Sequence, residues 1–262
     1  MKVAFIGVGR MGGTLLKCLI DHDLLAASDV CAYDLDEKRL QELPGGVVKA
    51  RTAGDAVSQS DILFLCVKPK DVGALLDDIG ERCSGKLIVS IAAGISTGFI
   101  EKYCPGSRVI RVMPNTPALV GEMAAAYSTG SRAGQEDSQL VERLLKSLGV
   151  IVKVEESLMD AVTGLSGSGP AYVYYVIKHL AEGGVAEGMD EETALQLAVK
   201  TVKGAAVMVE ETGMSPDELI GMVKSPGGTT VEGLKTLDEC GVGEALRKAV
   251  SKASKKSKEL GK

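Results

Sequence analysis

A glycine-rich segment near the start of the chain has the spacing of an anion-binding loop. Gly7, Gly9 and Gly12 follow the G-x-G-x-x-G pattern, with Val8, Arg10 and Met11 between them. Such a loop presents backbone N–H groups at the start of a helix, where the helix dipole attracts a pyrophosphate. The pattern predicts a dinucleotide site, and the alternative is a glycine-rich turn without a ligand.

An acidic residue lies where a dinucleotide site places its ribose ligand. Asp34 follows Gly12 by 22 residues, close to the roughly 20 residues expected for an acid that binds the adenosine ribose. A carboxylate there favours the free hydroxyl of NADH and repels the 2′-phosphate of NADPH. We therefore expect NADH or NADPH as the cofactor, with a preference for NADH that Lys38 and Arg39 partly offset.

Three further loops follow predicted strands, where an open α/β sheet binds its ligands. They are Val67-Lys68-Pro69, Ala92-Ala93-Gly94 and the segment 113–117, which contains Asn115. The Asn115 amide offers both a donor and an acceptor, which suits the carboxamide of a nicotinamide ring. Ordinary turns are the alternative for each loop.

Residues 225–230 form the second group of candidate binding residues. Thr229 and Glu232 have the spacing of a capping box, which would use the Thr229 hydroxyl and leave that of Thr230 free for a ligand. Pro226-Gly227 suits a type II turn, whose backbone N–H groups attract a carboxylate. The predicted substrate ligands are Ser225, Gly227, Gly228, Thr229 and Thr230.

A second helix start is predicted at residues 166–171, where Pro170 suits the first helical position after a cap at Ser168 or Gly169. Two such helix starts in one small domain exceed what capping requires, although both could be helix starts and nothing more. The predicted arrangement has both of them closing over the cofactor.

The two histidines limit the chemistry that the chain can perform on a substrate. His22 ends the first predicted helix, and His179 lies within a later one at a surface or an interface. A dehydrogenase acting on an alcohol or ketone usually needs such an acid or base. A cyclic imine needs less help, because its nitrogen arrives protonated. The Thr230 hydroxyl could hold that N–H group.

Alternating strands and helices predict an α/β fold with a Rossmann-type, doubly wound sheet. Residues 1–155 form this first domain, with strands expected at 2–6, 30–33, 47–50, 62–67, 87–91, 109–113, 124–128 and 150–154. Residues 156–262 show helical periodicity only and form a second, all-α domain. Its helices are expected at 157–163, 170–188, 191–211, 216–223, 229–240 and 243–260. Their small apolar side chains suggest that a partner subunit completes the core.

Composition excludes several classes of protein. The 262 residues carry a net charge of −5 and no apolar run long enough to cross a bilayer, so we expect neither nucleic acid nor a membrane as a partner. The six cysteines form no C-x-x-C pair, and neither a metal site nor a disulfide framework is expected. A basic cluster near the C-terminus is typical of a solvated helix face. We expect a cytoplasmic protein.

Taken together, these motifs resemble those of Δ1-pyrroline-5-carboxylate reductases. The resemblance rests on the glycine loop, the loops at 67–69, 92–94 and 113–117, and the segments 161–172 and 225–230. It implies NAD(P)H-dependent reduction of L-1-pyrroline-5-carboxylate to L-proline, the last step of proline biosynthesis, by a homodimer or larger homo-oligomer with interleaved helical domains.

The resemblance also implies roles for the predicted site residues. Gly7 to Gly12 would hold the pyrophosphate, 67–69 and 92–94 would flank the nicotinamide ribose, and Asn115 would contact the ring end. Residues 225–230 would bind the substrate, with the Thr230 hydroxyl on the imine nitrogen as the catalytic contact. Many members carry Asn or Ser followed by Arg where this chain has Asp34-Leu35.

Two other functions compete with this interpretation. A β-hydroxyacid dehydrogenase would place a lysine shortly after the glycines that open the first long helix, whereas the next lysine after Gly169 is Lys178, nine positions on. A non-catalytic NAD-sensing protein would not need the 225–230 segment.

Overall fold

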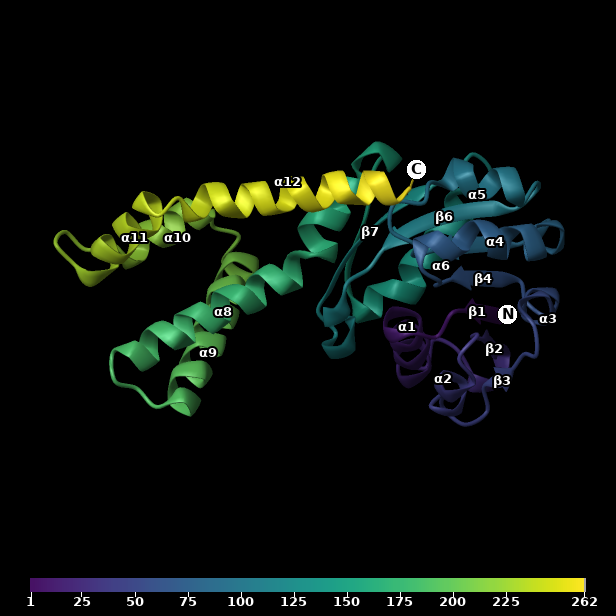
Figure 1. Ribbon diagram of the computed structural model, residues 1–262, viewed down its shortest axis with the longest axis horizontal. Coiled ribbons are helices and arrows are strands. Elements are labelled where there is room, and N and C mark those ends of the chain that lie inside the picture. The colour runs from purple at the N-terminus through teal and green to yellow at the C-terminus, as the bar shows by residue number, and fades with distance from the viewer. Residues whose placement is uncertain (262) are drawn as a thin grey trace. The chain divides into compact units, whose positions relative to one another are not determined.

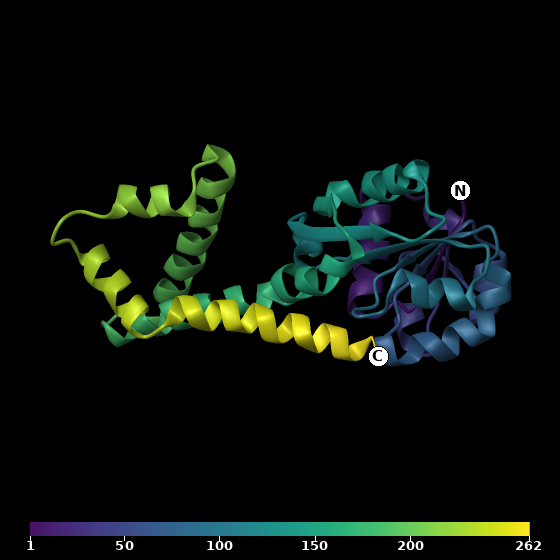
Figure 2. The ribbon, with the colours of Figure 1, turned by 90° about the horizontal axis from the view of Figure 1, so that it is seen from above.

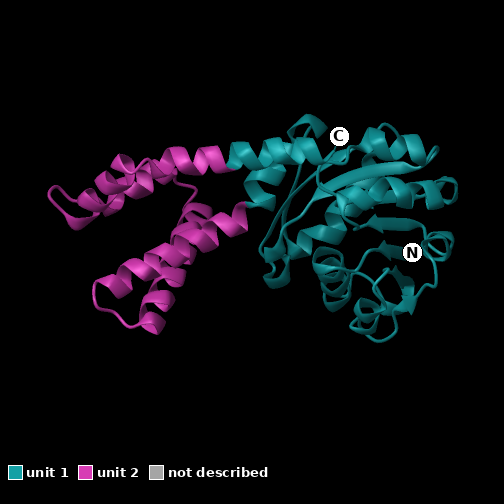
Figure 3. Ribbon diagram, viewed as in Figure 1, with its two compact units in different colours: residues 1–168, 250–262 teal, residues 169–249 magenta. Residues whose placement is uncertain are grey.

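The computed structural model describes residues 1–261, which form two compact units (Figure 3). The first unit comprises residues 1–168 and 250–262, and the second comprises residues 169–249. The units therefore divide later than the 155/156 boundary proposed from the sequence, and the end of the chain returns to the first unit.

The first unit contains a single eight-stranded sheet with the order β3-β2-β1-β4-β5-β6-β7-β8 (Figure 1). Its strands are β1 (Val3–Ile6), β2 (Val30–Tyr33), β3 (Val48–Lys49), β4 (Ile62–Leu65), β5 (Leu87–Ser90), β6 (Arg108–Met113), β7 (Met123–Thr129) and β8 (Gly149–Lys153). Neighbouring strands are parallel except β6 and β7, which are antiparallel. The predicted doubly wound sheet is confirmed.

Helices cover both faces of this sheet, as Figure 2 shows from above. They are α1 (Arg10–Asp21), α2 (Glu37–Gln41), α3 (Ala53–Ser58), α4 (Pro69–Ile79), α5 (Thr97–Tyr103), α6 (Gln135–Leu145) and α7 (Met159–Val162). One apolar core contains buried leucines of α1 and α6 together with Phe5, which stacks on Phe64 with ring centroids 4.6 Å apart. The other core contains buried side chains of α3, α4 and α5. The strands are apolar on both sides because both faces are covered.

The second unit is helical, as predicted. It contains α8 (Gly169–Ala186), α9 (Glu191–Thr212), α10 (Pro216–Val223) and α11 (Thr229–Glu239), and α12 (Val242–Leu260) begins in it and ends in the first unit. Few of its side chains are buried; Ala194 and Ala198 of α9 are. None of the helices in residues 1–261 combines the length and apolar composition that crossing a bilayer requires.

Candidate functional site

The glycine loop connects β1 to α1 and depends on close backbone contacts. Gly7 has a φ of +91°, which disfavours other residues. A Cβ on Gly12 would overlap the carbonyl oxygen of Gly7 and lie 2.8 Å from the Cβ of Cys66. Helix α1 begins directly after Gly9, and no side chain caps its N-terminus. The loop is therefore a cradle of backbone N–H groups that suits a pyrophosphate.

Asp34 lies beside this cradle and is held by backbone groups. The Val8 N–H donates to Asp34 Oδ2 at 2.8 Å, and the Asp36 N–H donates to Oδ1 at 2.9 Å. The Arg39 guanidinium lies 3.5 Å from Oδ2, and the Asp34 side chain is only 8% exposed. The carboxylate thus joins the first and second strand-to-helix loops, a structural role that its sequence position did not reveal.

Surface hollows lie on both sides of this junction. Asp34, Lys49 and Arg51 line one of them, and Gly9, Arg10 and Arg39 line the other. Glu37 also lines the first hollow and Glu42 the second, so side chains of both charges surround the position predicted for the adenosine ribose.

Sheet topology brings the other predicted cofactor loops to the same edge. Strands β1, β4, β5 and β6 are adjacent and parallel, so their carboxyl ends present the glycine loop and the segments 67–69, 92–94 and 113–117 side by side. Helix α4 begins at Pro69 with Lys68 as its N-cap. Gly94 has a φ of +78°. The structure therefore assembles all the predicted cofactor residues along one edge of the first unit.

Asn115 uses both ends of its amide inside the chain. Its Nδ2 donates to the Ser166 carbonyl at 3.1 Å, and its Oδ1 accepts the Ala124 N–H at 3.0 Å. The residue is 6% exposed. These bonds hold the 113–117 loop against the segment that follows α7, so Asn115 organises this part of the edge.

A helix start lies within residues 166–171, as predicted, because α8 begins at Gly169, directly after Ser168. Residues Thr163–Gly167 form a π-helical turn that continues α7 towards α8, and the Ser168 N–H donates to the Thr163 carbonyl at 2.9 Å. One residue, Ser168, therefore separates the end of the π-helical turn from the start of α8.

Close packing explains two glycines of the π-helical turn. A Cβ on Gly164 would lie 3.0 Å from the backbone N of Ser254, and one on Gly167 would lie 3.3 Å from Met113 Sδ. The glycines allow neighbouring segments to approach. A π-helical turn of this kind is frequent at functional sites.

Residues 225–230 form the predicted turn in the second unit. The Gly228 N–H donates to the Ser225 carbonyl at 2.9 Å, and Gly227 has a φ of +69°, as in a type II turn. The capping box predicted for Thr229 is wrong, because Gly228 is the N-cap of α11 and no side chain caps this helix. The backbone N–H groups at its start are thus left without a side-chain cap, and Thr230 is half-buried.

The histidines and Lys178 are not among the residues of the predicted cofactor loops or of the 225–230 segment. His22 is exposed at the C-terminal end of α1. His179 of α8 is 45% exposed and lies 2.7 Å from Glu182, which also pairs with Lys178 at 3.6 Å. Among residues 1–261, no group of three His, Cys, Asp or Glu side chains could hold a metal ion.

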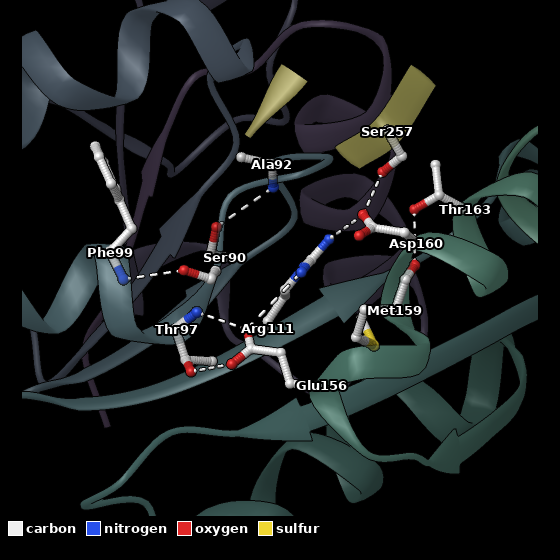
Figure 4. A network of polar contacts seen from close by, with 11 residues as sticks. Ser90, Ala92, Thr97, Phe99, Arg111, Glu156, Met159, Asp160, Thr163 and Ser257 are labelled. Carbon is white, nitrogen blue, oxygen red and sulfur yellow. Dashed lines mark hydrogen bonds and ion pairs between the residues drawn. The ribbon is translucent and has the colours of Figure 1, made fainter. Parts of the chain in front are cut away.

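The sequence did not indicate that the chain contains a buried charge at Arg111. Arg111 lies in the middle of the apolar strand β6, is 3% exposed, and pairs with Glu156 and Asp160 (Figure 4). The available signal was an arginine within an otherwise apolar run, but its partners are far away in the sequence.

Comparison with known proteins agrees with this geometry. The family model described as pyrroline-5-carboxylate reductase dimerisation matches residues 156–260, and the one described as NADP oxidoreductase, coenzyme F420-dependent, matches residues 2–94. The pyrroline-5-carboxylate reductase of Methanosarcina acetivorans is 44% identical over 100% of this chain and 98% of its own. That of Arabidopsis thaliana is 41% identical over 99% and 95%.

Solved structures show the same similarity. The crystal structure of Plasmodium falciparum pyrroline carboxylate reductase with NADP bound has a TM-score of 0.93 and 30% identity, and covers 100% of this chain and 98% of that one. The fold and the glycine loop define a dinucleotide-binding α/β protein with an added helical unit. Similarity over the whole chain then identifies its family: the chain belongs to the pyrroline-5-carboxylate reductases.

Proposed function

We propose that this protein reduces L-1-pyrroline-5-carboxylate to L-proline with a nicotinamide dinucleotide, the last step of proline biosynthesis. The observation that carries the proposal is 44% identity to a pyrroline-5-carboxylate reductase over the whole chain. The chain is an oxidoreductase and works as a homo-oligomer, in keeping with the dimerisation family that matches residues 156–260.

The glycine loop and its neighbours hold the cofactor. Its pyrophosphate lies on the backbone N–H groups of residues 7–12, where Gly7 and Gly12 leave no room for side chains. Residues 67–69 and 92–94 flank the nicotinamide ribose. The cofactor supplies a hydride when bound, and Asn115 shapes the ring end of the site through its bonds to Ser166 and Ala124.

Residues 225–230 bind the substrate. The type II turn and the uncapped start of α11 present backbone N–H groups, which suit the substrate carboxylate without an arginine. The Thr230 hydroxyl accepts a hydrogen bond from the protonated ring nitrogen, and this contact orients the C=N carbon for the hydride. The substrate arrives with its proton, so the chain needs no histidine near the reacting atoms.

NADH is the preferred cofactor in this proposal. The fixed carboxylate of Asp34 accepts hydrogen bonds from ribose hydroxyls and repels a 2′-phosphate. Arg39, 3.5 Å from Asp34 Oδ2, offsets part of this repulsion, so NADPH is used less efficiently.

A spectrophotometric assay with pyrroline-5-carboxylate tests the function. We expect substrate-dependent oxidation of both reduced cofactors, and the formation of proline in equal amount. Absence of turnover with either cofactor would refute the proposal. Binding of NADH without turnover would favour the NAD-sensing alternative, and turnover of a β-hydroxyacid would favour the dehydrogenase alternative.

A further inference from the structure

The 92–94 loop is attached to the rest of the first unit at three points. At its start, the Ala92 N–H donates to Ser90 Oγ at 3.3 Å. Beyond its end, at the start of α5, the Thr97 N–H and hydroxyl both donate to the Glu156 carboxylate at 2.6 Å (Figure 4). The third attachment is made by the last helix of the chain.

Helix α12 and the residue that follows it contact Gly94 of this loop through backbone atoms. A Cβ on Gly94 would overlap the carbonyl oxygen of Ser257 and lie 2.9 Å from the backbone N of Gly261. A Cβ on Gly261 would likewise overlap the carbonyl oxygen of Gly94. Two glycines thus face each other, and any change in the path of α12 would press on the loop.

A buried hydrogen bond fixes the end of α12 in this position. The Ser257 hydroxyl donates to Asp160 Oδ1 at 2.6 Å, and Ser257 is 2% exposed. Neighbouring residues of the same helix, such as Lys256 and Lys258, are exposed, so Ser257 is the polar contact that faces inward.

Arg111 joins the attachments into one cluster. Its guanidinium donates to Asp160 Oδ1 at 3.3 Å and lies 3.8 Å from Glu156 Oε1. One buried cation therefore pairs with both carboxylates, of which one holds the start of α5 and the other holds α12. Hydrogen bonds to charged groups in such a partly buried network are stronger than bonds between neutral groups on the surface.

We propose that the last turn of α12 is a positioning element for the nicotinamide half of the cofactor, and that Ser257 is a positioning residue that acts through Asp160 and the 92–94 loop. This proposal rests on the proposed function, in which that loop flanks the nicotinamide ribose. The helix does not touch the reacting atoms; it sets the loop that does touch the cofactor.

Substituting Ser257→Ala removes the hydroxyl and leaves the helix otherwise intact. Ser251→Ala is the matched control, because Ser251 is an exposed serine of the same helix. We expect Ser257→Ala to raise KM for NADH by about 3- to 10-fold while kcat changes by less than about twofold. Ser251→Ala leaves both constants unchanged.

Hydrogen exchange gives a readout that does not depend on activity. In the cofactor-free protein, Ser257→Ala should speed exchange of the backbone amides of residues 91–98 by about tenfold, while Ser251→Ala does not. Asp160→Asn keeps an acceptor for Ser257 but removes the charge facing Arg111, and it should raise KM as well.

Equal KM and equal exchange in the Ser257→Ala and Ser251→Ala proteins would overturn the inference, even if Ser257→Ala lowered Tm. The proposed function would survive that result, because it depends on turnover by the unsubstituted protein. Absence of that turnover would instead refute the proposed function, and the exchange experiment would still report whether α12 holds the loop.

Discussion

Asp34 carries a negative charge at the place where the adenosine ribose is proposed to bind. The backbone N–H groups of Val8 and Asp36 hold both carboxylate oxygens in place, so the charge cannot swing away from a 2′-phosphate. Cofactor preference should therefore depend on this single side chain.

Asp34→Asn should lower KM for NADPH by about tenfold, because the repulsion of the 2′-phosphate disappears while the shape is kept. KM for NADH should rise or stay constant. Asp78→Asn, which removes the same charge from an exposed residue of α4 that lines neither hollow, is the control. Steady-state kinetics with both cofactors measures the ratio, and an unchanged ratio in Asp34→Asn would contradict the role of the charge.

The contribution of the Thr230 hydroxyl to turnover can also be measured by a single substitution. Thr230→Ala should lower kcat/KM for pyrroline-5-carboxylate by about 10- to 100-fold, because a hydrogen bond to a charged group is lost. Thr230→Ser keeps the hydroxyl and should retain most activity. Thr236→Ala is the control on the same helix, since the Thr236 hydroxyl donates to the Glu232 carbonyl. Equal activity of the two alanine proteins would remove Thr230 from the mechanism.

At the scale of the element, the helix starts show how a capping pattern can mislead. Thr229 and Glu232 fit the spacing of a capping box, yet α11 begins one residue earlier, after Gly228. A complete capping box is instead found at α10, where Ser215 and Glu218 bond each other's backbone N–H groups. The spacing of the two residues alone does not say which residue is the N-cap, that is, the last residue before the helix begins.

The capping box of α10 makes part of the stability depend on pH. Hydrogen bonds from the Ser215 side chain and backbone hold the pKa of Glu218 below its usual value. A lowered pKa in the folded state means that the unfolded chain binds more protons in acid. The stabilisation is therefore present above the unfolded pKa and is lost as pH falls through the folded pKa.

Ser215→Ala should lower Tm by about 2–4 °C at pH 7. The difference in Tm between this protein and the unsubstituted one should shrink as pH falls below the ordinary pKa of Glu218. Thermal unfolding followed by circular dichroism from pH 7 down to about pH 2.5, below the lowered pKa of Glu218, measures it. A difference that stays constant across this range would show that Glu218 does not contribute to the cap.

At the scale of the whole molecule, periodicity was enough to predict the fold. Strands such as Ile62–Leu65 and helices such as Pro216–Val223 appear where the apolar patterns placed them. The sheet edge that gathers the cofactor loops followed from the order of strands. These features depend on local sequence, which a single chain displays directly.

Features that depend on distant contacts could not be predicted. The glycines at 164 and 167 leave room for Ser254 and Met113, which are distant from them in the sequence. Arg111 pairs with residues 156 and 160, and Ser257 joins them from the far end of the chain. The spacing of residues in the sequence does not predict a contact that forms only when the last helix packs on the first unit.

The second unit exposes more apolar surface than a free helical domain tolerates. Tyr174, Tyr175 and Met222 are at least 60% exposed, and such surfaces mark interaction sites. On α9, Ala194 and Ala198 are buried, while Leu195 and Leu197 project on either side of them and are 50% and 51% exposed. This distribution fits a helix with a second copy of the chain against its flanks.

The double substitution Leu195→Glu and Leu197→Glu should therefore shift the protein towards single chains, because burying two unpaired charges in an apolar interface costs free energy. Sedimentation equilibrium should give the unsubstituted protein the mass of at least two chains, and the double variant a lower mass. Gln196→Glu adds a charge on the opposite, exposed side of α9 and should leave the mass unchanged. If the double variant assembles as well as the Gln196→Glu protein does, these flanks of α9 do not form the interface. If the unsubstituted protein is itself a single chain, its exposed apolar residues do not hold two copies together.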